Sequence, residues 1–274
     1  MTRIRVCLFL FSFIFSVTTF AQSRNPVSFT LDRATVTSGE PVLLRIHVEN
    51  KSSKVMDFDL GQDDETKLSI VVTNPSGGHI EKIDHEQVAP IVHHSYSFSH
   101  FEPGDDYRVT LVLNEWFDFK QPGHYQIDIQ PMEPATMGGE KIPVPLSSLD
   151  LEVTSYDRIA LETACKRIME EVIHPGRGGD SLRAAKALEL VEDPNLMPFW
   201  ANLLSETNSD SLGKIAAIHL ASNNRDAIQG LAEVLRHARY DKNKKLARNS
   251  LQWIVTNTPD PDIKSLAKGA LKTR

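Results

Sequence analysis

The chain has 274 residues and carries 30 Lys and Arg against 36 Asp and Glu, which gives a formal net charge of -6 at pH 7. An acidic balance without interleaved aromatic and basic residues argues against nucleic acid as a partner. The chain has 2 cysteines, Cys7 and Cys165, so a fold held by a framework of disulfides is excluded.

The N-terminus has the pattern of a secretory signal peptide. Two arginines precede an apolar run, Val6 to Val17, and small residues follow at Thr19 and Ala21. The run is much shorter than the roughly 20 residues of a membrane span. We therefore expect a signal peptide over residues 1–21, a secreted protein, and no stable membrane insertion after cleavage.

From Val27 to about Thr154 the sequence predicts β-strands. Apolar residues alternate with polar ones, as along residues 42–48, and turn signals such as Pro122-Gly123 separate the alternating runs. Such intervals are typical of an antiparallel sandwich, for which we expect roughly seven to nine strands. The proline-rich stretch 131–145 predicts a long loop before a last strand, 149–153.

After Tyr156 the apolar spacing becomes that of helices. The apolar set Met197, Trp200 and Leu204 recurs 31 residues later as Ile228, Leu231 and Leu235, and 35 residues after that as Ile263, Leu266 and Ala270. A near-constant period of this size predicts stacked helix pairs. We expect the pairs near residues 180–206, 209–238 and 241–272, with a helix over 157–173 capping the first pair.

The charge divides at the same boundary. Residues 22–155 carry 10 Lys and Arg against 21 Asp and Glu, net -11, whereas residues 156–274 carry 18 against 15, net +3. From Val234 onward there are 10 basic residues and 3 acidic ones, net +7. The sequence leaves open whether this basic end contacts the acidic half of the same molecule or an anionic partner.

Histidines and acidic residues form two candidate metal sites, and we interpret neither as one. Along a strand, His94 and His100 would lie about 20 Å apart, too far for one zinc ion to bind both. The acidic loop 57–65 lacks the spacing of a helix-loop-helix calcium site. The sequence does not settle whether this loop, or the histidines within 85–100, bind a metal across strands; we predict no metal and no cofactor.

Motifs for catalysis are missing from the sequence. No Gly-x-Ser-x-Gly elbow is present, and the glycine-rich stretch 174–180 lacks the Gly-Lys ending of a phosphate loop. Cys165 lies on an apolar helical stripe, which favours a core position over a nucleophile. We therefore predict that the protein is not an enzyme.

Two family resemblances follow from these residues. Residues 22–155, with the turn Asn74-Pro75 and the element Pro122-Gly123-His124-Tyr125, resemble bacterial immunoglobulin-like modules of exported proteins, and their layout is similar to that of a small family of inhibitors of bacterial serine proteases. The first resemblance implies a buried Tyr125 ring whose hydroxyl bonds nearby backbone, and a periplasmic location. Residues 156–274 resemble short HEAT-like repeats, carried by residues 182–188 and Asp193-Pro194.

Together these patterns predict a multidomain all-β plus all-α protein: an antiparallel immunoglobulin-like β-sandwich, residues 22–155, followed by an α-solenoid of HEAT-like helix pairs, residues 156–274. We hypothesise an exported, non-enzymatic binding or scaffold protein whose helical half binds a protein partner. The alternative is a protease inhibitor acting through loops of the sandwich. The predicted binding residues are Asn195, Asn202, Arg225, Gln229, Glu233, Arg236, Arg239, Lys245, Arg248 and Lys264.

Overall fold

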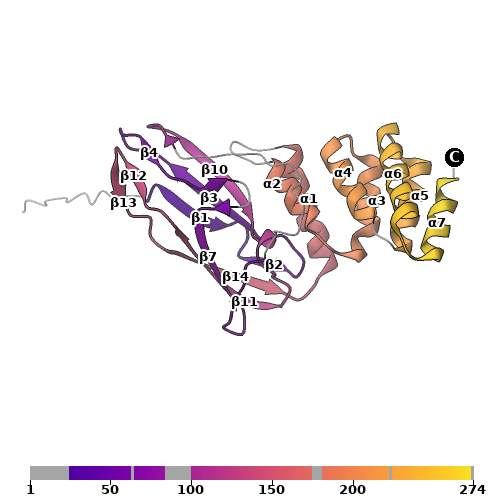
Figure 1. Cartoon of the computed structure of the whole chain (residues 1–274), viewed down its shortest axis with the longest axis horizontal. Helices are drawn as coiled ribbons and strands as arrows, with labels where there is room; N and C mark the ends of the chain where they lie inside the picture. The colour runs from indigo at the N-terminus through magenta and orange to yellow at the C-terminus, as the bar shows by residue number, and fades with distance from the viewer. Residues whose placement is uncertain (1–24, 63–64, 84–99, 175–180, 222–223, 273–274) are drawn as a thin grey trace, which may run out of the picture.

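A computed structural model describes residues 25–62, 65–83, 100–174, 181–221 and 224–272. Strands occupy its N-terminal part and helices its C-terminal part (Figure 1). The predicted order, a β-rich region followed by helices, is confirmed. The predicted signal peptide, acidic residues 63–64 and histidines 85, 93 and 94 lie outside the described residues. No helix within the described ranges is long and apolar enough to cross a membrane.

The described strands form four sheets. A three-stranded sheet has the order β1-β3-β10 and a five-stranded sheet the order β2-β14-β11-β7-β8, beside a four-stranded sheet β13-β12-β4-β9 and the pair β5-β6. Neighbours pair antiparallel, except that β2 runs parallel to β14. The strands are β1 (Val27–Leu31), β2 (Thr35–Thr37), β3 (Leu43–Glu49), β4 (Met56–Asp57), β5 (Gly61–Gln62), β6 (Glu65–Thr66), β7 (Leu68–Thr73), β8 (His79–Ile80), β9 (His100–Phe101), β10 (Asp106–Val112), β11 (Gly123–Pro131), β12 (Ala135–Met137), β13 (Glu140–Ile142) and β14 (Ser147–Thr154).

One hydrophobic core is shared by the three larger sheets. The alternation of β3 buries Leu44, Ile46 and Val48, and that of β11 buries Ile127 and Ile129. Both sets belong to the same cluster of buried side chains. The polar residues between them face outward, as the period of two requires.

The turn into β11 has the features that the Pro-Gly-x-Tyr element implied. Gly123 has a φ of +134°, and a Cβ there would lie 2.8 Å from Pro75, so only glycine fits without strain. The Tyr125 ring is buried, and its hydroxyl donates a hydrogen bond of 2.7 Å to the carbonyl of Gln121. This bond ties β11 to the loop that precedes it.

The prediction of a long loop over 131–145 is wrong in part. Within it, β12 and β13 form a hairpin whose turn, Gly138 and Gly139, has positive φ at both glycines. β12 also pairs with β4, so the hairpin supplies two of the four strands of the sheet β13-β12-β4-β9. The glycines that suggested a loop supply the turn of the hairpin.

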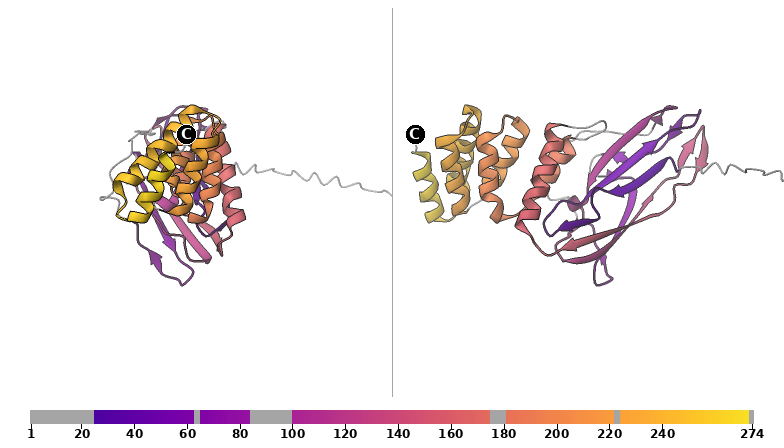
Figure 2. Two further views of the ribbon diagram at one scale, coloured as in Figure 1. Left: turned by 90° about the vertical axis from the view of Figure 1, so that its right-hand side faces the viewer. Right: turned by 180° about the vertical axis from the view of Figure 1, so that it is seen from behind.

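The C-terminal part of the described chain contains seven α-helices, in agreement with the predicted helix positions. Helices α2, α4 and α6 pack side by side in one layer, and α3, α5 and α7 in a second (Figures 1 and 2). The helices are α1 (Arg158–Ile173), α2 (Ser181–Glu189), α3 (Met197–Glu206), α4 (Asp210–Leu220), α5 (Arg225–His237), α6 (Asp241–Asn257) and α7 (Pro261–Leu271), with short 3-10 turns η1 (Leu113–Glu115) and η2 (Pro194–Leu196).

Side-chain caps fix where several of these helices begin. Asp157, Asn224 and Asp260 each accept hydrogen bonds from backbone N–H groups in the first turn of α1, α5 and α7. The faces between the layers are apolar: Trp200, Leu204 and Leu231 are fully buried there. The two layers therefore share a continuous core.

The helical core extends into the β-rich region. Leu43 at the start of β3 and Val112 at the end of β10 belong to the same buried cluster as Leu161 and Cys165 of α1. The backbone N–H of Asp157 also donates to the Thr37 hydroxyl, 2.9 Å away. The strands and the first helices are therefore packed against each other at this junction.

Candidate functional site

A groove with a volume of about 910 Å³ runs across α3, α5 and α7. Apolar and small side chains form most of its lining, including Met197, Pro198, Ala201, Ile228, Ala232, Leu266 and Ala270. The polar side chains in the lining are Asp226, Gln229, Glu233, Arg236 and Ser265. An apolar floor with a few polar groups is typical of a surface that binds another molecule.

The shape of the groove depends on the close approach of α3 and α5. A Cβ on Gly230 would lie 2.9 Å from the Cβ of Ala201, a distance that real Cβ atoms do not adopt. Gly269, on the α7 side, has nothing within 4 Å of an added Cβ. The lining is thus tightly packed between α3 and α5 and open at α7.

Charged groups lie along α5 in the groove. Glu233 Oε1 is 2.7 Å from Arg236 Nη1, and His237 Nε2 lies 3.5 Å from the other Glu233 oxygen. Asp226, in the first turn of α5, forms no ion pair within the described part of the chain and so keeps a free carboxylate in the lining. The groove can therefore accept apolar side chains together with a cationic group beside Asp226.

Three of the ten predicted binding residues line this groove: Gln229, Glu233 and Arg236. Arg225 is exposed one residue before Asp226, and Lys264 is half-buried on α7, but neither belongs to the lining. Asn202 is exposed on α3. Sequence reasoning missed Asp226, Ser265 and Gly269. The spacing of Asp226 from Gln229 and of Gly269 from Leu266 by one helical turn was the available signal, and no such signal pointed to Ser265.

The other four predicted residues lie elsewhere. Asn195 donates to the carboxylate of Asp193 (3.0 Å) and to the Tyr156 hydroxyl (3.3 Å), next to the start of α1. The Arg239 guanidinium lies over the ring of Tyr240, 5.5 Å from its centre. Lys245 and Arg248 are exposed on α6, outside the lining of the groove.

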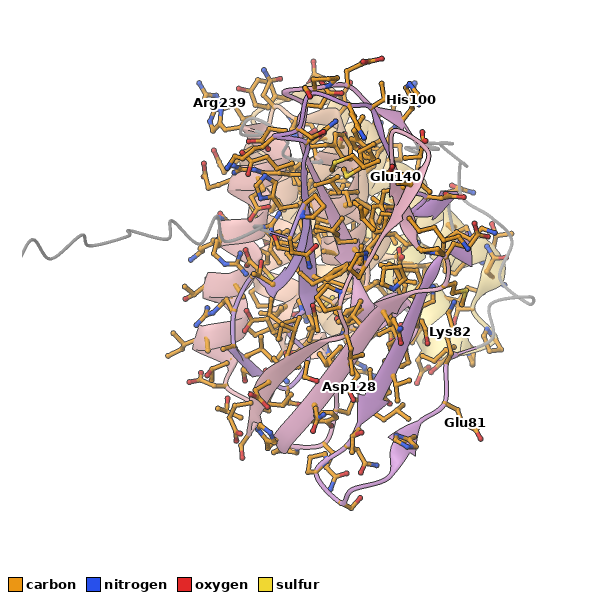
Figure 3. All side chains as sticks on the ribbon, turned by 90° about the vertical axis from the view of Figure 1, so that its left-hand side faces the viewer. Glu81, Lys82, His100, Asp128, Glu140 and Arg239 are labelled. Carbon is orange, nitrogen blue, oxygen red and sulfur yellow. The ribbon has the colours of Figure 1, made fainter. Side chains whose placement is uncertain are left out.

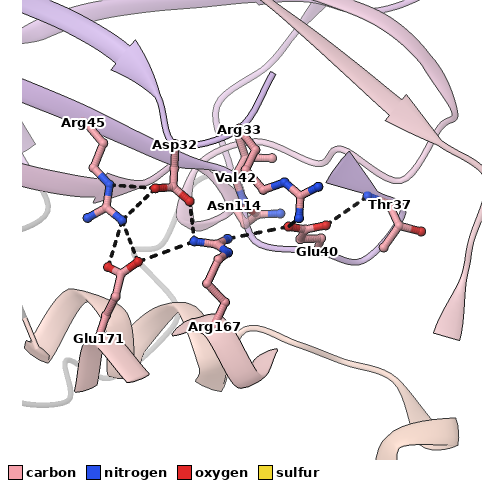
Figure 4. A network of polar contacts seen from close by, with 9 residues as sticks. All are labelled: Asp32, Arg33, Thr37, Glu40, Val42, Arg45, Asn114, Arg167 and Glu171. Atoms are coloured by element: carbon pink, nitrogen blue, oxygen red, sulfur yellow. Dashed lines mark hydrogen bonds and ion pairs between the residues drawn. The ribbon is translucent and has the colours of Figure 1, made fainter. Parts of the chain in front are cut away.

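A second polar cluster joins β-strands to α1 (Figure 4). Arg45 of β3 binds Asp32 (2.9 Å) and Glu171 of α1 (2.8 Å), and Arg167 of α1 binds the other oxygen of Asp32. Glu40 is buried, accepts from the Thr37 N–H, and lies 3.7 Å from Arg167. Burial raises the pKa of Glu40. These groups form ion pairs with one another and so connect the strands to α1, while Glu40 Oε1 and Arg167 Nε are buried without a hydrogen-bond partner among the described residues.

Three described histidines of the β-rich region, His47, His100 and His124, lie beside one or two carboxylates each. His47 lies 2.9 Å from Asp106, and His100 lies 2.8 Å from Asp57 of the predicted acidic loop. Within the described ranges no group of three or more His, Cys, Asp or Glu could hold a metal ion. Residues 63–64 and 84–99 are outside those ranges.

Cys165 is fully buried among apolar side chains. Its burial raises the pKa of the thiol to about 12. The thiolate needed for nucleophilic attack is therefore not formed at neutral pH, and Cys165 acts as a core residue.

One known family model matches the β-rich region. Residues 26–154 match the family model of the flagellar collar protein C N-terminal domain. That match spans the described strands from β1 to β14 and ends before α1. No curated protein matches the chain.

Solved structures share only distant likeness with the chain. A β-glucosidase from Listeria innocua is 12% identical to this chain. The match covers 47% of this chain and 16% of the β-glucosidase, with a TM-score of 0.23. The sporulation control protein Spo0M from Bacillus subtilis is 14% identical, with coverages of 53% and 54% and a TM-score of 0.23. A polysaccharide lyase is 11% identical, with coverages of 90% and 33% and a TM-score of 0.19. The chain thus spans a sixth to about half of the length of these proteins.

Proposed function

We propose that this chain is a non-enzymatic scaffold protein of the bacterial flagellar apparatus, and that the groove across α3, α5 and α7 binds its protein partner. The observation that carries the proposal is the match of residues 26–154 to the N-terminal domain of flagellar collar protein C. A collar is a structural part, so the name of that family favours assembly over catalysis.

The groove supports the location of the binding site. It has an apolar lining and a free carboxylate, and it lies on helices outside the matched region. In this arrangement the β-rich region resembles the collar domain, and the helices add a surface for another component. Apolar grooves between helices commonly bind an apolar segment of a partner protein.

The finer assignments of fold and location belong to the same proposal. The shared core of the sheets supports an immunoglobulin-like sandwich over residues 22–155, and the two helix layers support a HEAT-like solenoid over 156–274. The signal-peptide pattern over residues 1–21 supports export to the periplasm. That the protein is not an enzyme is part of this proposal, in which Cys165 is a buried core residue. The alternative of a protease inhibitor stays a prediction.

A matched pair of substitutions tests the groove. Leu266 lines it and is 43% exposed, whereas Ile218 is 56% exposed on α4 in the other layer. Both can be changed to Lys without burying a charge. We expect the full-length mature protein to capture a flagellar component from a basal-body preparation, Ile218→Lys to capture it equally, and Leu266→Lys to capture it at least about tenfold less, since burying an uncompensated charge is costly.

Two outcomes would contradict the proposal. If no flagellar component is captured by the unchanged protein, the scaffold role is wrong. If Leu266→Lys captures as well as Ile218→Lys, the partner binds elsewhere on the chain. Equal melting temperatures of the three proteins would show that the comparison reports binding and not folding.

A further inference from the structure

The two ends of the molecule carry opposite charge. Helices α6 and α7 lie at one end, and the sheets lie at the other, with α1 to α4 between them (Figures 1 and 2). The basic C-terminal end therefore does not reach the acidic strands of the same molecule. This answers the question that the charge distribution of the sequence left open.

We name the cationic surface of α6 and α7 the basic hairpin. Its residues are Lys244, Lys245, Arg248, Lys264, Lys268 and Lys272. None of these six forms an ion pair with any carboxylate in the described part of the chain, whereas nearby Lys242 is 2.7 Å from Asp210. Because like charges gathered without counter-charges repel one another, this surface favours an anionic neighbour.

The outer face of the five-stranded sheet has the complementary charge. Its strands β2, β14, β11, β7 and β8 contain no Lys or Arg, and their outward residues include Asp128, Asp150 and Glu152, which we name the acidic sheet face. Asp150 and Glu152 are 78% and 50% exposed. Figure 3, viewed along the molecule from the sheet end, shows Asp128 on the side away from the helices.

The side chains around these carboxylates are mostly polar, and His124 lies 3.2 Å from Asp150 and 4.0 Å from Glu152. The polar side chains include Ser69, Ser148 and Thr154 on neighbouring strands, all exposed. The exposed side chains of Gln126 and Gln130 lie on the same face, which therefore offers a largely polar surface on which a helical hairpin can lie. Within one molecule, helices α1 to α4 separate the two surfaces (Figures 1 and 2).

We propose that the protein self-associates head to tail, with the basic hairpin of one copy docked on the acidic sheet face of the next. The occupant is a second copy because this chain itself carries both complementary surfaces and cannot join them within one molecule. Such a contact is heterologous: it forms a ring where the rotation between copies closes, and an open filament where it does not. It involves no residue of the groove lining, so it stands independently of the proposed partner site.

Sedimentation of the mature full-length protein tests this contact. At about 50 mM salt we expect the average mass to rise with protein concentration, and at about 300 mM salt we expect self-association to weaken at least about tenfold, because shorter screening lengths weaken exposed charge pairs. A mass that stays monomeric at low salt, or an association that salt does not weaken, would overturn the proposal.

Charge reversals locate the two surfaces. We expect the triple variant Lys245→Glu, Arg248→Glu, Lys268→Glu, and the double variant Asp150→Lys, Glu152→Lys, each to remain monomeric alone. Mixing them should restore association, since each supplies a surface that the other has lost. The control Lys214→Glu, at an exposed position of α4, should associate as the unchanged protein does. Association of either reversed variant alone, or failure of the mixture to associate, would refute the assignment of these surfaces.

Discussion

Arg45 and Glu171 lie 126 positions apart in the sequence, yet the Arg45 Nη2 atom is 2.8 Å from Glu171 Oε2. This pair connects β3 to α1 and shares its guanidinium with Asp32. Both side chains are about one-third exposed, so solvent screens part of their attraction. The pair nevertheless belongs to a network that joins the two regions of the chain.

A double-mutant cycle measures this connection. We expect Arg45→Ala and Glu171→Ala to lower the free energy of unfolding by less in combination than the sum of the single effects, with a coupling energy of about 1 kcal/mol. Denaturant unfolding at low salt provides the values. The coupling should shrink in about 1 M salt; additive effects at low salt would show that the pair contributes nothing to stability.

Stability should depend on pH through His219. Its Nε2 atom is 2.9 Å from the Leu188 carbonyl and its ring stacks on Trp200 at 4.1 Å, and burial lowers the pKa of the imidazole. A lowered pKa means that the unfolded chain binds the proton more tightly. The contribution of His219 is therefore present above pH 6.5, and it is lost as the pH falls from there through the lowered pKa.

The comparison with His219→Gln isolates this contribution. Between about pH 7 and pH 5 the unchanged protein should lose more thermal stability than His219→Gln, because only the histidine must stay neutral in the folded state. Other titrating groups are common to both proteins and cancel in the difference. An equal loss of melting temperature in both would contradict the prediction.

Two glycines of the groove should respond to alanine in opposite ways. At Gly269, where an added Cβ meets nothing within 4 Å, alanine should stabilise the protein by about 0.5–1 kcal/mol through its higher helix propensity. At Gly230 the Cβ would clash with Ala201 at 2.9 Å, so alanine should destabilise it despite the same propensity gain. Melting curves distinguish the two; a Gly230→Ala protein as stable as Gly269→Ala would contradict the close packing of α3 on α5.

The hydroxyl of Tyr125 should contribute to the stability of the β-rich region. Tyr125→Phe removes its bond to the Gln121 carbonyl and leaves that buried ring otherwise unchanged, so we expect a loss of about 1 kcal/mol. Tyr240→Phe, in which no hydroxyl hydrogen bond within the described residues is lost, should change stability by less than about 0.5 kcal/mol. Chemical denaturation of both proteins gives the comparison. Equal effects would argue against a role for the hydrogen bond between Tyr125 and Gln121.

Local pattern was sufficient to predict most elements. The helix predicted over 157–173 is α1, and the apolar set repeated from Met197 predicted the buried faces of α3 and α5. The same pattern placed Leu266 in the core, but it is 43% exposed. It is on the last helix, α7, where no further helix follows within the described chain to cover it. A repeat in the sequence does not show which member is terminal.

Contacts between distant residues could not be predicted in this way. The Arg45–Glu171 pair, the parallel pairing of β2 with β14, and the addition of the β12–β13 hairpin to β4 depend on how the chain closes in space. For the candidate site, helical spacing was enough to bring Gln229, Glu233 and Arg236 together. It did not show that Gly230 brings α3 against α5.

Site-specific photo-crosslinking in motile cells tests the central claim most directly. A photoreactive residue at Gln229, in the groove, would be compared with one at Lys214, exposed on α4 in the other layer. We predict that Gln229 forms a crosslink to another component of the flagellum and that Lys214 does not form the same one. Crosslinks to that component from Lys214 alone, or none from Gln229 in cells whose flagella are assembled, would contradict the proposal that this groove is a scaffold surface.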